Sequence, residues 1–246
     1  MNMPSELDEI SGIAFNNGNS DTVYAEQDEA GKLFHFKWND KNLRITKFGP
    51  KGDFEDVALC RGFVIMLRSD GVVFTFPLSE AGKGKADGVK IWDHLLPPGE
   101  FEGMNAEDEN GKITILCKHC ESEKTSKQCS GFSFSLGGDG SLKSSGNFKI
   151  NVKQIESKLG RIKIQFRPSG LAEDPVSHNW FIISSVNKLL VITDQSWSVL
   201  SVYDLNPAFF VQPEGIAFDK NRNLFISNER NNTSNGTILR FNYQSK

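Results

Sequence analysis

Carboxylate and hydroxyl side chains recur at one position of a repeated six-residue motif. The motif reads ISGIAF, FEDVAL, FEGMNA, PSGLAE and PEGIAF, and its second residue is in turn Ser11, Glu55, Glu102, Ser169 and Glu214. If these side chains converge around one axis, they offer the hard oxygen ligands that suit Ca²⁺ or Mg²⁺. Because like charges held close together are costly, such a ring needs a cation or basic side chains beside it.

Mostly polar side chains stand at the end of the predicted second strand, the segment that follows each motif. Aligning these ends gives the pairs Gln27-Asp28, Arg68-Ser69, Cys117-Lys118, Ser184-Ser185 and Asn228-Glu229. We therefore expect the ring to be completed by residues from this second set, namely Arg68, Lys118, Ser184, Asn228 and Glu229. Arg68 and Lys118 would offset the carboxylates, and the metal ligands predicted from the pattern are Glu55, Glu102 and Glu214.

Two interpretations of this ring remain open. In the functional one, the ring holds Ca²⁺ or a small ligand. In the structural one, each glutamate accepts backbone N–H bonds from neighbouring repeats or pairs with Arg68 and Lys118. No general base is evident, and the sequence assigns no catalytic residue. The four histidines fall at unrelated positions of the repeat, so we expect them to be surface or strand residues; they are His35, His94, His119 and His178.

The spacing of the motif indicates the elements that position the ring. Its third residue recurs at intervals of 44, 47, 67 and 45 residues, and each repeat continues with short segments rich in β-branched and aromatic residues. Four short antiparallel strands in each unit are typical of a propeller blade, whose first strand lines a central channel. We predict an all-β single domain, a β-propeller of five four-stranded blades with six as the alternative count. The repeats lie near residues 10–53, 54–100, 101–167, 168–212 and 213–246.

The third and fifth repeats depart from the common length. The third carries about 20 extra residues, which we assign to a polar hairpin at 118–130 and to a segment at 151–163 compatible with one short helix. The fifth lacks its fourth strand, so we expect the closing strand to come from the N-terminus, just ahead of Leu7. We also expect the natural protein to be longer at that end, with an export signal or lipid anchor there.

Three of the four cysteines crowd one segment, CKHCESEKTSKQC. Their spacing is not that of a zinc site. A local disulfide between Cys129 and either Cys120 or Cys117 fits the sequence as well as free thiols do. Such a bridge would imply an oxidising compartment.

Charge and hydropathy indicate which kinds of partner this chain is not expected to have. The 246 residues carry a net charge of −3, which does not suggest a nucleic-acid surface, so we predict no nucleic-acid partner. No apolar run approaches the roughly 18 residues of a membrane span, so no transmembrane segment is expected. The partner would be a small ligand or another protein, and we expect a monomer.

Several motifs in combination resemble the SdiA-regulated family of bacterial β-propellers. They are ELDEISGIAF, DFEDVAL, MLRSDG, FEGMNA, RPSGLAEDP, ISSVNKLLVITD and QPEGIAFDKNRNLFISNE, which together span most of the chain. The resemblance implies a bacterial envelope protein, periplasmic or membrane-anchored. More distant propeller relatives include calcium-dependent phytases and lactonases of the gluconolactonase group, an analogy at the level of the fold alone.

The sequence thus favours a non-enzymatic binding or scaffold propeller of the envelope, whose polar funnel holds a divalent cation, Ca²⁺ by preference. The alternative is a metal-dependent hydrolase, phytase-like or lactonase-like, that uses the same glutamates. A phytase would surround its metals with many basic side chains to hold several phosphates, and only Arg68 and Lys118 are placed to do so.

Overall fold

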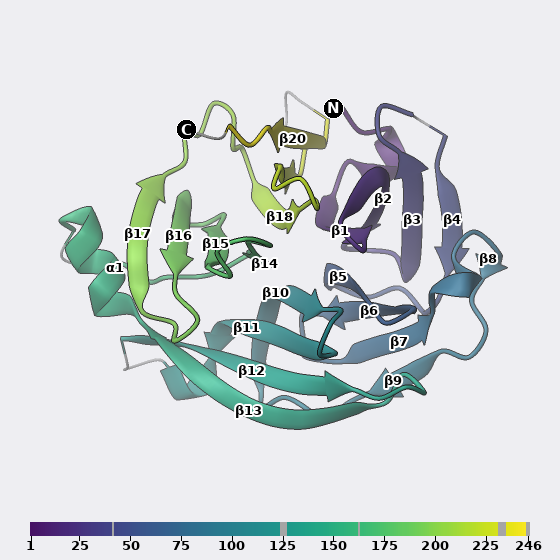
Figure 1. The fold of residues 1–246 in the computed structure, drawn as a ribbon, viewed down its shortest axis with the longest axis horizontal. Helices are drawn as coiled ribbons and strands as arrows, with labels where there is room; N and C mark the ends of the chain where they lie inside the picture. The colour runs from purple at the N-terminus through teal and green to yellow at the C-terminus, as the bar shows by residue number, and fades with distance from the viewer. Residues whose placement is uncertain (41, 124–126, 162, 231–234, 245–246) are drawn as a thin grey trace.

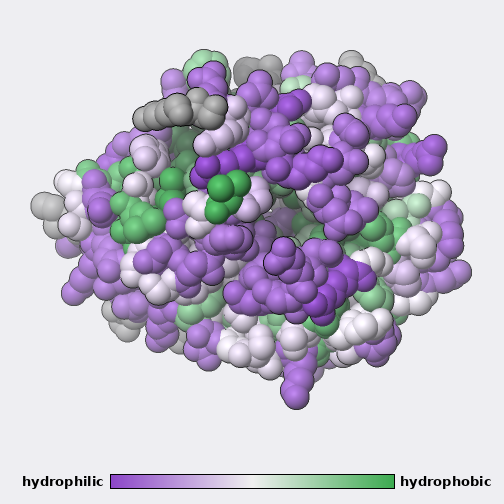
Figure 2. Space-filling view, viewed as in Figure 1, coloured by the Kyte–Doolittle hydropathy of each residue, from purple (hydrophilic) through white to green (hydrophobic). Residues whose placement is uncertain are grey.

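The computed structural model describes residues 1–40, 42–123, 127–161, 163–230 and 235–244. Within these residues the strands form five sheets, which stand around a central axis as the blades of a five-bladed β-propeller (Figure 1). This confirms the predicted fold and the blade count. The face seen in Figure 2 is hollowed near its centre and is largely hydrophilic around that hollow.

Each blade is an antiparallel meander that runs outward from the axis. The first two blades contain β1 (Ile10–Asn16), β2 (Asn19–Gln27), β3 (Lys32–Lys37), β4 (Arg44–Lys47), β5 (Phe54–Cys60), β6 (Phe63–Arg68), β7 (Val73–Pro77) and β9 (Lys90–Trp92). The third and fourth contain β10 (Gly99–Glu107), β11 (Lys112–Cys120), β12 (Gln128–Leu136), β13 (Leu142–Asn151), β14 (Gly170–Glu173), β15 (Trp180–Ser184), β16 (Leu189–Thr193) and β17 (Val199–Asp204). The fifth contains β18 (Pro213–Phe218), β19 (Leu224–Asn228) and β20 (Thr237–Phe241).

The repeated motif forms the innermost strand of every blade, and its glycine is required where neighbouring inner strands approach each other. A Cβ atom on Gly170 would lie 2.5 Å from the carbonyl oxygen of Glu214. A Cβ atom on Gly215 would lie 2.4 Å from the carbonyl oxygen of Ser11. Distances this short exclude a side chain, so the glycines let the five inner strands close around a narrow channel.

The core lies between the blades, where the apolar faces of adjacent sheets meet. Phe15 of the first blade packs edge-on against Phe225 of the fifth, with ring centroids 4.7 Å apart. Phe48, after the first blade, packs in the same way against Phe54 of the second, at 5.0 Å. Burying these rings removes large apolar areas from water and fixes the order of the blades.

The N-terminus supplies the closing strand of the fifth blade, as predicted. Met1 and Ile238 exchange backbone hydrogen bonds, at 2.7 Å from the Met1 amino group and 2.9 Å from the Ile238 N–H. Asn2 forms an antiparallel bridge with Thr237, and the Met3 N–H donates to Gly236 at 2.8 Å. This pairing covers the start of β20 and joins the first blade to the last.

The predicted short helix is present as α1 (Val152–Leu159), which lies outside β17 (Figure 1). The Asn151 side chain caps it by accepting from the Lys153 N–H, and Gly160 ends it in the left-handed conformation. The short 3₁₀ helices are η1 (Ser5–Leu7), η2 (Leu78–Glu80) and η3 (Glu121–Glu123). Among the described residues, no helix combines the length and apolar character of a membrane span.

One strand of the second repeat crosses to the first blade. β8 (Gly84–Lys85) pairs in parallel with the outer strand β4, so that sheet has five strands. The sequence did not indicate this exchange, because the two residues carry no strand pattern.

Candidate functional site

The inner strands place the predicted ring at one mouth of the channel, at their N-terminal ends. Glu102 and Glu214 are buried there, with 3% and 8% of their surfaces exposed, and Glu55 is partly buried. Glu55 lies close enough to Glu102 for the charge of Glu102 to raise the pKa of Glu55. The predicted convergence of the three carboxylates is therefore present, and we call Glu55, Glu102 and Glu214 the carboxylate ring.

Lys118 supplies the basic side chain of the ring. Its ammonium forms an ion pair with Glu102. Although burial alone would lower the pKa of Lys118, the charges of Glu102, Glu55 and Glu214 raise it above its ordinary value. Lys118 thus stays protonated among three carboxylates, which it cannot neutralise alone.

Burial disfavours the ionised form of the ring carboxyl groups. It raises the pKa of Glu55 and of Glu102. The charge of Glu102 raises the pKa of Glu55 further, and for Glu102 the charge of Glu214 acts in the same direction while Lys118 lowers the pKa. Burial also raises the pKa of Glu214, even though Lys118 and a hydrogen bond from Ser185 act the other way. A divalent cation would reverse these shifts, because it favours the ionised form of every carboxylate around it.

Several oxygen atoms around the ring lack a hydrogen-bond partner within the described part of the chain. Two of them are Glu102 Oε2 and Asn228 Oδ1, on residues only 3% and 1% exposed. The others are Glu26 Oε2 and Asp28 Oδ1. A buried acceptor without a donor costs about 1–3 kcal/mol, so such atoms call for a proton, a water molecule or a cation.

The predicted serines are engaged in hydrogen bonds to the protein, and those of Ser169 and Ser11 join neighbouring blades. The Ser169 hydroxyl donates to the carbonyl of Pro213 in the next blade at 2.8 Å. Ser11 accepts at its carbonyl from the Ser227 hydroxyl at 2.5 Å, which joins the fifth blade to the first. The Ser184 hydroxyl donates to the carbonyl of Arg167 at 2.5 Å. The neighbouring Ser185, and not Ser184, reaches the ring through Glu214.

Arg68 does not offset the ring as the sequence suggested. Its guanidinium donates two hydrogen bonds of 2.8 Å to Asp70, which lies two residues further along the same turn. Because this partner is local and the geometry is bidentate, it holds Arg68 away from the carboxylates. Lys118 is therefore the ion-pair partner that the described residues provide for Glu102.

Asn228, the last residue of β19, and Glu229, which follows it, lie at the rim as predicted. Burial and the charge of Glu214 raise the pKa of Glu229 to about 8. The carboxylate of Glu229 accepts from the side-chain amide of Gln212, which also bonds to Glu214. Gln212 precedes the fifth motif by one residue, so the repeated motif did not indicate it.

Glu26 is a further acidic residue that the sequence did not single out. It is fully buried, its Oε1 accepts from the Gly12 N–H at 2.7 Å, and burial raises its pKa well above the usual range. Ser227 takes the same place in the fifth blade, where it accepts from the Gly215 N–H at 2.8 Å. Both residues stand one position before the aligned ends, so the repeat did contain a signal.

Asp56 shows that part of the acidic motif is structural. It occupies the glycine position of the second repeat, and its carboxylate accepts from Val57 N–H at 2.8 Å and from Met104 N–H at 2.6 Å. Met104 belongs to the third blade, so Asp56 joins two blades. The structural interpretation thus holds for Asp56, whereas Glu102 Oε2 of the carboxylate ring lacks such a donor among the described residues.

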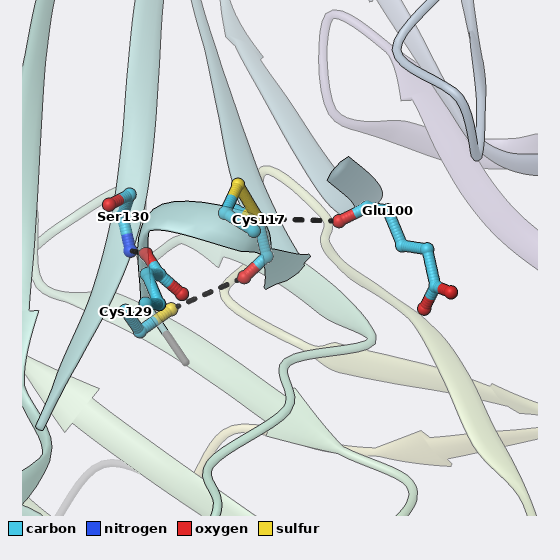
Figure 3. The surroundings of a disulfide bond; sticks show 6 residues. Glu100, Cys117, Cys129 and Ser130 are labelled. Atoms are coloured by element: carbon cyan, nitrogen blue, oxygen red, sulfur yellow. Dashed lines mark hydrogen bonds between the residues drawn. A yellow bond between two sulfur atoms is a disulfide. The ribbon is translucent and has the colours of Figure 1, made fainter. Parts of the chain in front are cut away.

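A disulfide fixes the backbone that carries Lys118 (Figure 3). It joins Cys117 to Cys120, with Cα atoms 5.9 Å apart, whereas Cys129 is a buried free thiol. Both predicted pairings, which used Cys129, are therefore wrong. The physical reason is a bulge in β11, where Phe101 pairs with Cys117 but Glu100 pairs with His119. The extra residue, Lys118, shortens the path between the two cysteines.

Both sulfur atoms lie against backbone carbonyl groups around this bulge, and only the free thiol of Cys129 can donate a hydrogen bond. Cys117 Sγ lies 3.4 Å from the carbonyl oxygen of Glu100, and the Cys129 thiol lies 3.5 Å from the carbonyl oxygen of Cys117 (Figure 3). The disulfide and the bulge together orient Lys118 toward the start of β10, where Glu102 lies.

Comparison with known proteins supports the architecture. No protein-family model matches the chain, and no curated protein sequence does. Solved structures do match: the luciferin-regenerating enzyme has a TM-score of 0.61 at 10% identity, over 98% of this chain and 94% of that one. The glutaminyl cyclase of Myxococcus xanthus has a TM-score of 0.59 at 13% identity, over 98% and 96%. These likenesses show the fold alone.

A third similar structure is a calcium-binding protein, regucalcin, from Agrobacterium tumefaciens. Its TM-score is 0.55 at 10% identity, over 95% of this chain and 85% of that one. The matches thus include enzymes and a calcium-binding protein on one fold, so the site of this chain must be judged on its own residues.

Proposed function

We propose that this chain is a binding propeller whose carboxylate ring holds a divalent cation, Ca²⁺ by preference, at the mouth of the central channel. The observation that carries the proposal is the set of buried oxygens without donors, above all Glu102 Oε2. A hard cation satisfies such oxygens directly, whereas a proton satisfies one of them at a time.

The charge balance supports a divalent ion. The three ring carboxylates and Glu229 are offset by Lys118, which leaves an excess of negative charge when all are ionised. One divalent cation removes most of that excess. Ca²⁺ suits the site better than Mg²⁺, because Ca²⁺ accepts irregular sets of six to eight oxygens and Mg²⁺ demands near-octahedral geometry.

Two features support the envelope location that the sequence resemblance implies. The Cys117–Cys120 disulfide is a bond that persists in oxidising compartments. Millimolar Ca²⁺ outside the cytoplasm would also match the modest affinity of a site that already contains Lys118. Within this proposal the bound cation organises the mouth for a small ligand or a protein partner, and the hydrolase alternative remains to be tested with a panel of phosphate esters and lactones.

Calcium titration tests the proposal. The protein is stripped with EGTA, exchanged into chelator-free buffer and titrated with Ca²⁺ in a calorimeter, alongside Glu102→Gln and Glu214→Gln. Each glutamine keeps one oxygen and removes one negative charge, so folding should persist. We expect one Ca²⁺ for each chain and an affinity at least about tenfold weaker in both variants.

Asp204→Asn is the matched control, because Asp204 lies on the outer strand β17 and pairs with Arg161 at the surface. It should bind Ca²⁺ as the unmodified protein does. If no heat and no thermal stabilisation appear up to about 10 mM Ca²⁺, above the weakest extracellular calcium sites, the proposal is wrong.

A further inference from the structure

A cavity of about 420 Å³ lies at the opposite mouth of the channel from the carboxylate ring. Its walls are the later residues of the five inner strands and the turns that follow them, including Ile13, Met104, Leu171 and Ile216. On β10, Glu102 of the ring precedes Met104 of the cavity by two residues, so the two sites share a channel but use different side chains. The volume lies within the range of small-molecule pockets.

Glu173 and His178 form a hydrogen-bonded pair in the lining of this cavity. Glu173 ends the inner strand β14, and its Oε1 lies 2.9 Å from His178 Nδ1. The side-chain amide of Gln195 donates to the same oxygen at 3.2 Å. Because an ionised carboxylate only accepts, a neutral His178 donates from Nδ1 and keeps Nε2 as an acceptor. The pair therefore offers two acceptors, Glu173 Oε2 and His178 Nε2.

The turn that carries His178 is fixed by its neighbours. The buried Asp174 accepts from the Val176 N–H and the Ser177 hydroxyl, and Arg222 of the fifth blade forms an ion pair with it. His178 has a φ of 56°, in the left-handed region that residues with a Cβ rarely adopt. Such strain persists where the surroundings determine the conformation, and it is concentrated at functional sites.

The charge of the cavity mouth is negative. Among the described residues, the lining includes one lysine, Lys220, and five carboxylates, which are Glu107, Asp108, Glu109, Glu173 and Asp219. Lys112 forms an ion pair with Glu107 at 3.0 Å, and the Arg61 guanidinium donates to the backbone carbonyls of Asp108 and Glu109, so these two cations offset only part of the negative charge. Asp219 accepts hydrogen bonds from Asn223 in its own turn and from the Ser20 hydroxyl of β2 in the first blade. Burial raises the pKa of Glu173, and the nearby charge of Glu107 raises it further. A positively charged ligand would relieve this repulsion.

We propose that this cavity is a second binding site, which takes a small organic amine with an apolar body. The ammonium group would donate to Glu173 and His178, and the body would lie against the aliphatic side chains of the inner strands. An ammonium has three donors and no acceptor, so it complements a pair that offers acceptors. A carboxylate ligand would be repelled, and a neutral alcohol would gain only one donor bond.

Three ligands of the same shape test the chemistry: phenethylamine, phenethyl alcohol and phenylacetate. Their binding is followed by ligand-observed NMR and calorimetry with the full chain. We expect phenethylamine to bind at least about tenfold more tightly than phenethyl alcohol, the difference expected for a charge-assisted bond, and phenylacetate not to bind. Equal affinity for the amine and the alcohol would overturn the proposal, as would no binding of the amine at about 10 mM.

Two variants locate the binding. Glu173→Gln removes the charge, and His178→Asn removes the imidazole while keeping a residue that tolerates the left-handed conformation. Both variants should bind phenethylamine at least about tenfold more weakly, and Glu173→Gln should leave the affinity for phenethyl alcohol unchanged. Asp204→Asn, on the outer strand β17, is the matched control and should bind the amine normally. An unchanged amine affinity in folded Glu173→Gln would contradict the site, whatever the calcium titration shows.

Discussion

Glu229→Gln should stabilise the protein above neutral pH when no divalent cation is present. Glu229 follows β19 at the rim of the carboxylate ring, and its carboxylate accepts a hydrogen bond from Gln212. Burial and the charges of Glu214 and Asp28 raise its pKa from 4.5 to about 8. A glutamine carbonyl can accept the same hydrogen bond but carries no charge, so the substitution removes the repulsion alone.

The sign of the effect follows from proton binding. In the unfolded chain Glu229 loses its proton near pH 4.5, whereas in the folded state it keeps the proton up to about pH 8. The folded state therefore binds more protons in this window, and stability falls as the pH rises through it. The full shift corresponds to at most about 5 kcal/mol, and solvent at this partly exposed carboxyl reduces the expected loss to about 2 kcal/mol.

Urea unfolding in EDTA at pH 5, 6, 7 and 8 measures this loss, with tryptophan fluorescence as the signal. Glu229→Gln should match the unmodified protein near pH 5 and exceed its free energy of unfolding by about 2 kcal/mol at pH 8. The control Asp204→Asn should follow the unmodified protein throughout. If Glu229→Gln shows no advantage at pH 8, the electrostatic account of the rim is refuted.

Three further changes probe other parts of the structure. Asp56→Ala leaves two buried N–H groups without an acceptor and should lower the free energy of unfolding by about 2–4 kcal/mol in urea titrations; a loss below about 1 kcal/mol would contradict the blade-joining role. Lys118→Met should strengthen Ca²⁺ binding about tenfold in calorimetry by removing a competing charge, and weaker binding would show that Lys118 supports the metal. Deleting residues 1–3 should lower the melting temperature and speed amide exchange at Ile238, whereas unchanged exchange would exclude a closing role for that segment.

The fold could be predicted because the inner strands are constrained in the same way in every blade. At Gly170 and Gly215 the adjacent inner strand lies too close to leave room for a side chain. The same constraint recurs from blade to blade, so it appears at a near-constant interval in the sequence. The strand before the glycine then places Glu102 and Glu214 at one mouth. The carboxylate ring was predictable for the same reason.

Side chains that depend on local backbone geometry could not be placed from the repeat. Lys118 reaches the ring because a bulge in β11 turns its side chain toward the channel. Arg68 stands at the end of the second strand of its own repeat, but it forms an ion pair with Asp70 in the adjoining turn. The Cys117–Cys120 pairing depends on the same bulge. Sequence alignment of repeats assumes regular strands, and a bulge changes which residue faces the channel.

The cavity at the other mouth could not be predicted from the sequence for a different reason. Its distinctive pair, Glu173 and His178, lies at the end of an inner strand and in the following turn, and that turn is not repeated between blades. The histidines fall at unrelated positions of the repeat, so the repeat carries no signal for His178. Only the folded turn brings these two side chains together.

Crystallography with terbium, a luminescent and anomalously scattering substitute for Ca²⁺, tests the central claim most directly. Crystals of the chain soaked in Tb³⁺ should give an anomalous peak bounded by Glu55, Glu102 and Glu214, with Lys118 displaced from Glu102. Crystals of Glu102→Gln should lose that peak. A ring that holds no Tb³⁺ and keeps the Lys118 ammonium paired with Glu102 would contradict the claim that this mouth binds a divalent cation.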